Sequence, residues 1–132
     1  MISITNIDLG NVILADARFD DDTLTFAAAG TVAEGTILAR DSVSGNLVPY
    51  VQGGSTNENG IPKTILTYDV TATAAGNIPI RAPIFGKFRL DRAIIAADGD
   101  NSNVTKAVID QLRDFAIILK DVEELYILDN QP

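Results

Sequence analysis

The sequence predicts a mainly β fold with one α-helix (α+β), of a small β-sandwich or barrel-like kind. Segments rich in β-forming residues recur at spacings of roughly ten residues up to Tyr50, which is typical of such folds. Only residues 104–115 carry a long helical period. The chain has 132 residues, 46% of them hydrophobic and 21% charged, which fits one globular domain. The low aromatic content implies an aliphatic core, and its largest members are expected to be Phe19, Phe26, Phe85, Phe88 and Phe115.

The N-terminal segment predicts an extended arm. Ile2 and Ile4 alternate with polar residues, as in a strand with one apolar face. Such a segment either forms an edge strand of its own domain or pairs with another sheet. We expect residues 1–22 to form this arm and a lead-in strand, and residues 23–132 to form a single domain. No basic start followed by an apolar stretch and a cleavage site is visible, so we expect no signal peptide.

Residues 20–22 are three consecutive aspartates and predict a solvated turn. A calcium loop is the alternative, but it needs oxygens at alternating positions, which three consecutive acids do not supply. A strand is expected over residues 23–26, where apolar and polar residues alternate cleanly.

A β-hairpin is expected over residues 34–50. β-forming residues at 36–38 and 47–50 flank a polar centre, Ser44-Gly45-Asn46, that favours a tight reversal. The glycine- and asparagine-rich residues 53–60 predict a surface loop, and residues 65–72 predict another strand.

Residues 78–90 contain two prolines, which limit the kind of strand that this segment can form. Because proline cannot donate to a β-ladder, Pro79 and Pro83 predict an edge strand or a broken one. Arg81, Lys87, Arg89 and Arg92 also fall here; they are either a patch for an acidic partner or the solvent face of a strand, and we favour the solvent face.

A helix is expected from Val104 to about Phe115, because Val104, Val108, Leu112 and Phe115 form one apolar stripe. Ser102 or Asn103 is the expected N-cap. Residues 116–119 are β-like, and residues 122–128 predict a last strand or a docked tail.

Composition limits the possible functions. The formal net charge of −8 disfavours binding to nucleic acid or to an anionic membrane surface. The absence of cysteine and histidine excludes disulfides, Cys/His zinc sites and histidine catalysis. No apolar run approaches about 18 residues, the length of a membrane span. We expect no enzymatic activity, no metal and no cofactor, and a binding or structural role by elimination.

Three stretches, in this order, resemble the bacteriophage head decoration protein family of the lambda type. Residues 35–40 read Gly-Thr-Ile-Leu-Ala-Arg, close to the family pattern A-G-T-x-L-G-R, and residues 44–50 read Ser-Gly-Asn-Leu-Val-Pro-Tyr, close to G-K-L-V-P-Y. Residues 107–118 follow the family's helix pattern A-I-x-Q-L-R-x-x-G-I-x-V. The resemblance covers about residues 23 to 119. Ala39 and Ala116 stand where the family usually has glycine.

The resemblance implies a homotrimer on the outer surface of the expanded phage head, made in the host cytoplasm before it joins the virion. Such proteins hold neighbouring major capsid subunits together against internal DNA pressure. Their N-terminal arm orders on the capsid and extends a capsid sheet. By this resemblance the capsid-binding residues are expected in the arm, at Ile2, Ile4, Thr5, Ile7 and Leu9.

Two other functions remain open from the sequence. One is a virion-associated module that binds glycans or a host surface, with Tyr50, Tyr68 and Tyr126 as the aromatic platforms. The other is a small hydrolase that uses a pair of carboxylates.

Overall fold

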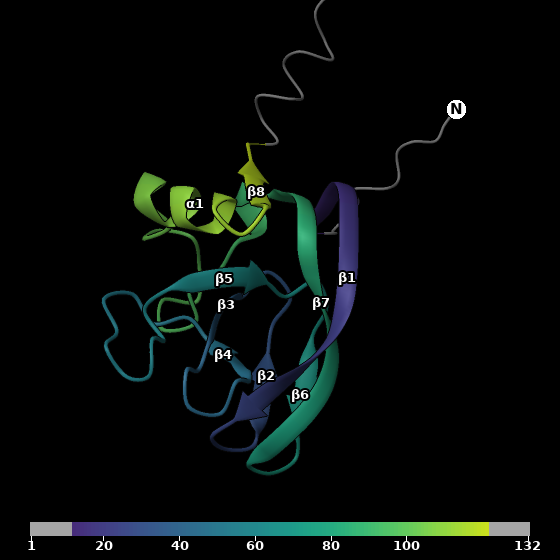
Figure 1. Cartoon of the computed structure of the whole chain (residues 1–132), viewed down its shortest axis with the longest axis vertical. Coiled ribbons are helices and arrows are strands. Elements are labelled where there is room, and N and C mark those ends of the chain that lie inside the picture. The colour runs from purple at the N-terminus through teal and green to yellow at the C-terminus, as the bar shows by residue number, and fades with distance from the viewer. Residues whose placement is uncertain (1–11, 122–132) are drawn as a thin grey trace, which may run out of the picture.

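The computed structural model describes residues 12–121 and confirms a mainly β fold with a single α-helix, in which the main sheet nearly closes on itself like a barrel (Figure 1). The arm residues 1–11 and the C-terminal residues 122–132 lie outside the described part. In chain order the elements are β1 (Ile13–Phe26), β2 (Gly30–Val32), β3 (Ile37–Arg40), β4 (Leu47–Pro49), β5 (Pro62–Ile65), β6 (Val70–Ala72), β7 (Gly76–Arg89), the 3-10 helix η2 (Leu90–Arg92), α1 (Lys106–Arg113) and β8 (Ile117–Lys120).

Six strands form the main sheet in the order β5-β3-β4-β1-β7-β8, and β2 and β6 form a separate antiparallel pair. The predicted hairpin is confirmed, because β3 and β4 are antiparallel, with Leu38 opposite Pro49 and Arg40 opposite Leu47. The predicted β-like run after the helix is also confirmed, as β8, which lies parallel to the end of β7. Figure 1 shows α1 beside β8 at one end of the molecule and the β2–β6 pair toward the other.

The longest feature is the antiparallel ribbon of β1 and β7, which pair from Ile13 opposite Phe88 to Phe26 opposite Gly76. The predicted turn at residues 20–22 is therefore wrong: all three aspartates lie inside β1. Neighbouring cations explain the difference, since Asp21 faces Arg81 on β7 and Asp22 pairs with Arg40 on β3. Cross-strand partners of this kind override a local turn preference. The ribbon also shows no break at residue 22, so the lead-in segment from residue 13 onward is part of the sheet.

β7 continues through both prolines. Among the described residues β8 pairs with β7 only from Gly86 onward, so the stretch with the prolines has β1 as its one paired neighbour. The Arg81 N–H, between the prolines, donates to the Tyr68 hydroxyl at 3.0 Å, and the Pro83 carbonyl accepts from the Thr64 hydroxyl at 2.7 Å. Because alternate residues direct their backbone groups to the same side of a strand, the proline nitrogens also face away from β1, and no ladder bond is lost. The strand is not broken, but the expected edge character holds over this stretch.

The core has two clusters that meet at β3. Ile37 and Ala39 belong to the cluster that includes Phe88 and the buried α1 residues, whereas Leu38 belongs to the cluster of Leu24, Leu47, Leu66 and Ile80. All three β3 residues are fully buried. Since successive side chains of a strand point to opposite faces, β3 contributes to both clusters at once.

The phenylalanine prediction is confirmed for Phe26 and Phe88, which are buried, and is wrong for two others. Phe85 is 46% exposed and Phe115 is 38% exposed. Phe85 points to the outer face of β7 under the Arg18 guanidinium, and Phe115 follows the end of α1 under the Lys63 ammonium. Phe19 is half-buried.

The helix is shorter than expected at both ends. Thr105, and not Ser102 or Asn103, is the N-cap, and its hydroxyl accepts from the Val108 N–H at 3.4 Å. Ser102 and Asn103 instead donate to the aspartates of their own loop. At the other end the chain turns into β8 at Ala116, which has a φ of +66°. Residues other than glycine, asparagine and aspartate rarely adopt this left-handed conformation.

Gly35 allows the chain to enter β3. Its φ is +91°, and a Cβ there would meet the carbonyl oxygen of Arg92. Its own carbonyl accepts from the Ile94 N–H at 2.7 Å, so the two backbones lie too close together for a side chain.

Replacing Ala116 with glycine is expected to stabilise the protein. The left-handed conformation costs alanine about 1–2 kcal/mol, and the substitution removes this cost. Glycine also has more conformational freedom in the unfolded chain, which offsets part of the gain, so we expect the free energy of unfolding to rise by about 0.5–1 kcal/mol. The matched control is Ala39→Gly, which removes a buried methyl group from a strand and should destabilise by about 1–2 kcal/mol. Urea unfolding of both variants measures the two values. A less stable Ala116→Gly protein would contradict the explanation.

Candidate functional site

The residues predicted to bind the capsid, Ile2, Ile4, Thr5, Ile7 and Leu9, lie outside the described residues. The structure does fix the point from which they extend. Val12 is fully buried, and its carbonyl accepts from the Arg89 N–H at 2.8 Å. On the other side of β7, Lys120 at the end of β8 pairs with the same Arg89. Both ends of the described chain therefore flank the C-terminal end of β7.

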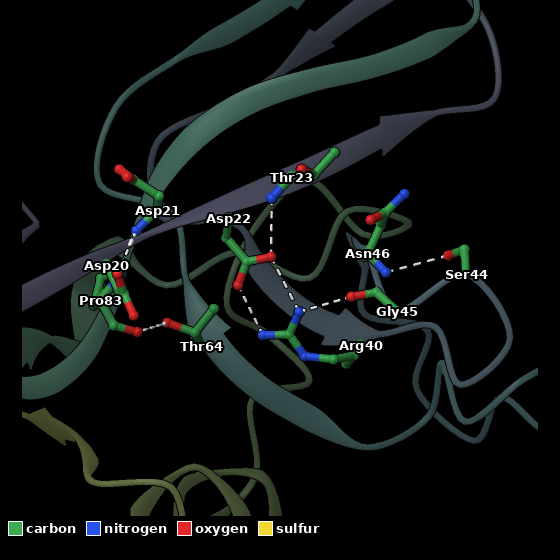
Figure 2. Close-up of polar contacts among 10 residues, drawn as sticks. All are labelled: Asp20, Asp21, Asp22, Thr23, Arg40, Ser44, Gly45, Asn46, Thr64 and Pro83. Carbon is green, nitrogen blue, oxygen red and sulfur yellow. Dashed lines mark hydrogen bonds and ion pairs between the residues drawn. The ribbon is translucent and has the colours of Figure 1, made fainter.

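The most developed polar arrangement is a bidentate ion pair between Asp22 of β1 and Arg40 of β3 (Figure 2). The Arg40 guanidinium donates to the two Asp22 oxygens at 2.8 and 3.0 Å and to the Gly45 carbonyl at 2.9 Å. The Asp22 carboxylate also accepts from the Thr23 N–H at 2.8 Å. Asp22 shares a strand face with Leu24, and Arg40 shares one with Leu38, so the pair closes one end of the second core cluster.

The pKa of the Asp22 carboxyl is lowered. Partial burial on its own would raise this pKa, but the hydrogen bonds from Arg40 and from the Thr23 amide outweigh that effect. Donation of its hydrogen bonds to the Asp22 carboxylate raises the pKa of Arg40. Both groups are therefore charged at neutral pH, and each stabilises the charge of the other.

Two hollows lie on either side of this pair, and Asp22 lines both. The larger, of about 590 Å³, lies over β1 and β7 and is lined by Asp21, Asp22, Thr23, Tyr68, Pro79, Ile80 and Arg81. The smaller, of about 280 Å³, lies between β5 and β7 and is lined by Asp22, Arg40, Lys63, Thr64, Ala82, Pro83, Ile84 and Phe115. The smaller hollow combines cations with exposed apolar side chains, whereas the larger is bordered by the exposed ion pair of Asp21 and Arg81.

The tyrosines do not form a shared platform in the described part of the chain. Tyr50 is only 3% exposed and packs in the first core cluster, so its predicted role as a glycan platform is wrong. It follows a hairpin strand and points inward, where its ring fills the core. Tyr68 is exposed and accepts from the Arg81 N–H, and Tyr126 lies outside the described residues.

The acidic side chains that the structure describes are mostly held by local hydrogen bonds or ion pairs. Asp100, in the loop before α1, accepts from both the N–H and the hydroxyl of Ser102, which lowers its pKa. Arg81, Lys87 and Arg92 of the basic cluster are exposed, as the solvent-face prediction expects, whereas the Arg89 side chain is only 13% exposed and pairs with Asp91 at 2.8 Å. Within residues 12–121 there is no group of three or more acidic residues placed to hold a metal ion. No helix in this part of the chain is long and apolar enough to span a membrane.

The Asp22–Arg40 pair and the hollows beside it are not predicted from the sequence. The two residues are 18 positions apart, and β4 lies between their strands in the sheet. The sequence does contain one indication of the pair. Three consecutive aspartates within a β-like stretch continue a strand most readily when cations lie nearby to offset their charge.

Comparison with known proteins identifies no relative: no protein-family model matches the sequence, and no curated protein matches it either.

Replacing Asp22 with asparagine tests the ion pair and its pH dependence. Because the folded-state pKa is lowered, the pair contributes stability above the ordinary value of 3.8 and loses it as pH falls through the folded-state pKa. At neutral pH we expect a loss of about 1 kcal/mol in the free energy of unfolding, a modest value because the Arg40 side chain is 42% exposed.

Urea unfolding at pH 7 and at about pH 3 measures the effect. The difference between the variant and the wild-type protein should shrink in acid, because the wild-type carboxylate is then increasingly protonated. Asp21→Asn is the control, since that side chain is 87% exposed and its contact with Arg81 is 3.6 Å long. A control as destabilised as Asp22→Asn, or a pH-independent difference, would contradict the assigned role.

Proposed function

We propose that this chain is a capsid decoration protein that binds the outside of an expanded phage head as a homotrimer and stabilises the head against internal DNA pressure. Its partner is the major capsid protein, and its place in the virion is the outer capsid surface. The proposal begins from the ordered sequence motifs and gains support from where those motifs lie in the fold.

The observation that carries the proposal is the backbone at residue 116. The family pattern has glycine at this point, directly after the helix, and in this chain the residue is alanine with a φ of +66°. Left-handed backbone is the physical reason for a family to keep glycine there. The hairpin motif likewise falls on two strands that pair with each other, β3 and β4, and the helix motif runs through α1 into β8. The left-handed backbone at Ala116 supports the proposal, because it gives a physical reason for the glycine of the family pattern.

Physical chemistry favours an arm for the capsid contact. A strand that adds to a sheet gains backbone hydrogen bonds and small side-chain pockets. Ordering a free segment opposes binding, so each arm binds weakly and three arms on one trimer increase the avidity. The arm extends from Val12, which the core and Arg89 hold in place.

Binding to expanded heads that lack decoration protein, prepared from the phage that encodes this chain, tests the proposal. The full chain is expected to bind saturably and to raise the temperature at which the heads disrupt. Deletion of residues 1–11 should weaken binding at least about tenfold, because both the pairing and the avidity are lost. A folded chain that ignores expanded heads would overturn the proposed function.

Point variants test the arm more finely. Ile4→Asp should weaken head binding, whereas Ser3→Asp adds the same charge on the opposite side of an extended segment and should change it little. Equal effects of the two variants would indicate that charge, and not strand-like pairing, is responsible.

A further inference from the structure

Ile84 is an exposed apolar side chain in the described part of the chain. On β7, Ile80, Ala82 and Phe88 share its side of the strand, and all three are buried in the core, whereas Ile84 is 54% exposed. Phe115, which is 38% exposed, borders the same hollow of about 280 Å³. We call this hollow the Ile84 groove; its lining residues are those given above for the smaller hollow. On this face of β7 the groove lies between Ala82, which belongs to the second core cluster, and Phe88, which belongs to the first.

The groove carries a positive charge in an acidic protein. Arg40 and Asp22 neutralise each other through their ion pair, which leaves the charge of Lys63. The Lys63 ammonium lies 3.8 Å from the centre of the Phe115 ring, and within residues 12–121 it forms no ion pair with a carboxylate. The chain as a whole has a net charge of −8. A matching ligand is therefore a segment with apolar side chains and carboxylates.

The C-terminal segment has this composition. Residues 122–128 read Val-Glu-Glu-Leu-Tyr-Ile-Leu, five apolar or aromatic residues and two glutamates. The eleven residues after Asp121 can span at most about 36–40 Å when extended. A segment of this length can extend beyond the end of β8 toward another molecule.

The direction of β8 favours a neighbouring copy over the same copy. β8 is parallel to β7 and pairs Gly86 with Ile117 and Arg89 with Lys120. The chain therefore passes Ile84 before β8 begins and moves away from the groove along the whole strand. Docking in its own groove would require the chain to reverse its direction after Asp121, whereas a groove that lies ahead of β8 on a neighbouring copy would require no reversal.

We propose that the C-terminal segment, residues 122–128, of one copy docks in the Ile84 groove of a neighbouring copy. Its apolar side chains cover Ile84 and Phe115, and its glutamates lie near Lys63. This is a contact between copies of the chain and does not require the capsid, so its test is separate from the head-binding assay.

Disulfide crosslinking tests the contact in full-length protein, because the natural chain contains no cysteine. An Ile84→Cys chain with a size tag is mixed with an untagged chain that carries Leu125→Cys or Tyr126→Cys; these adjacent positions sample both sides of an extended tail. Under mild oxidation, at least one mixture should yield the mixed dimer at about five times or more the level of the control. The control is Lys87→Cys in place of Ile84→Cys, since Lys87 is exposed on the opposite face of β7.

A chain that carries both Ile84→Cys and Leu125→Cys distinguishes the two copies. A crosslink within one chain at high dilution, with no mixed dimer in the mixtures, would overturn the proposal in favour of docking in the same copy. Mixed dimers no more abundant than those of the Lys87→Cys control would also overturn it.

Charge reversal provides an independent readout. Lys63→Glu should lower the association constant of the copies, measured by analytical ultracentrifugation, by roughly fivefold to tenfold, and Lys87→Glu should change it little. Adding Glu123→Lys and Glu124→Lys to the Lys63→Glu chain should restore association. A loss that these tail changes do not restore would contradict contact between Lys63 and the tail.

Discussion

The fold depends on the burial of both faces of β3. Ile37 and Ala39 pack in the cluster under α1, while Leu38 packs in the cluster under the β1–β7 ribbon. A strand buried in this way admits few substitutions, because each residue must fit a different set of neighbours. Arg40, the last residue of β3, lies at the edge of the second cluster, where its partly exposed guanidinium pairs with Asp22. The acidic run in β1 and the hairpin are thus parts of one arrangement.

The β1–β7 ribbon places the two ends of the described chain together. On one side of β7 the Val12 carbonyl accepts from the Arg89 N–H, and on the other side Lys120 of β8 is the strand partner of Arg89. The proposed capsid-binding arm and the proposed docking tail would therefore both extend from the C-terminal end of β7. The Ile84 groove, which receives a tail, lies earlier on β7, on the side of β5. Such a separation allows one copy to make both contacts at once.

Local chemistry made much of the fold predictable from the sequence. The Ser44-Gly45-Asn46 reversal, the helix and the β-forming run of β8 each depend on a few neighbouring residues. Each of these elements is confirmed, although α1 is two residues shorter than predicted at either end. The errors arose where distant partners decide: three aspartates continue a strand because Arg40 and Arg81 lie beside them. Phe85 and Phe115 stay exposed under cations that no local pattern associates with them. The groove was unpredictable for the same reason, since its lining comes from β1, β3, β5, β7 and the turn after α1.

The hydrogen bonding of β7 has a consequence for crowded conditions. Exposed strand edges are where folded β proteins join into insoluble assemblies, because free N–H and C=O groups can form hydrogen bonds with an incoming strand. Along its outer side this strand offers nitrogens without hydrogen at Pro79 and Pro83, and the Arg81 N–H between them is already bonded to Tyr68. A foreign strand finds no ladder to extend there. Molecules that meet on this side of β7 can therefore recognise one another only through the shape and charge of their side chains.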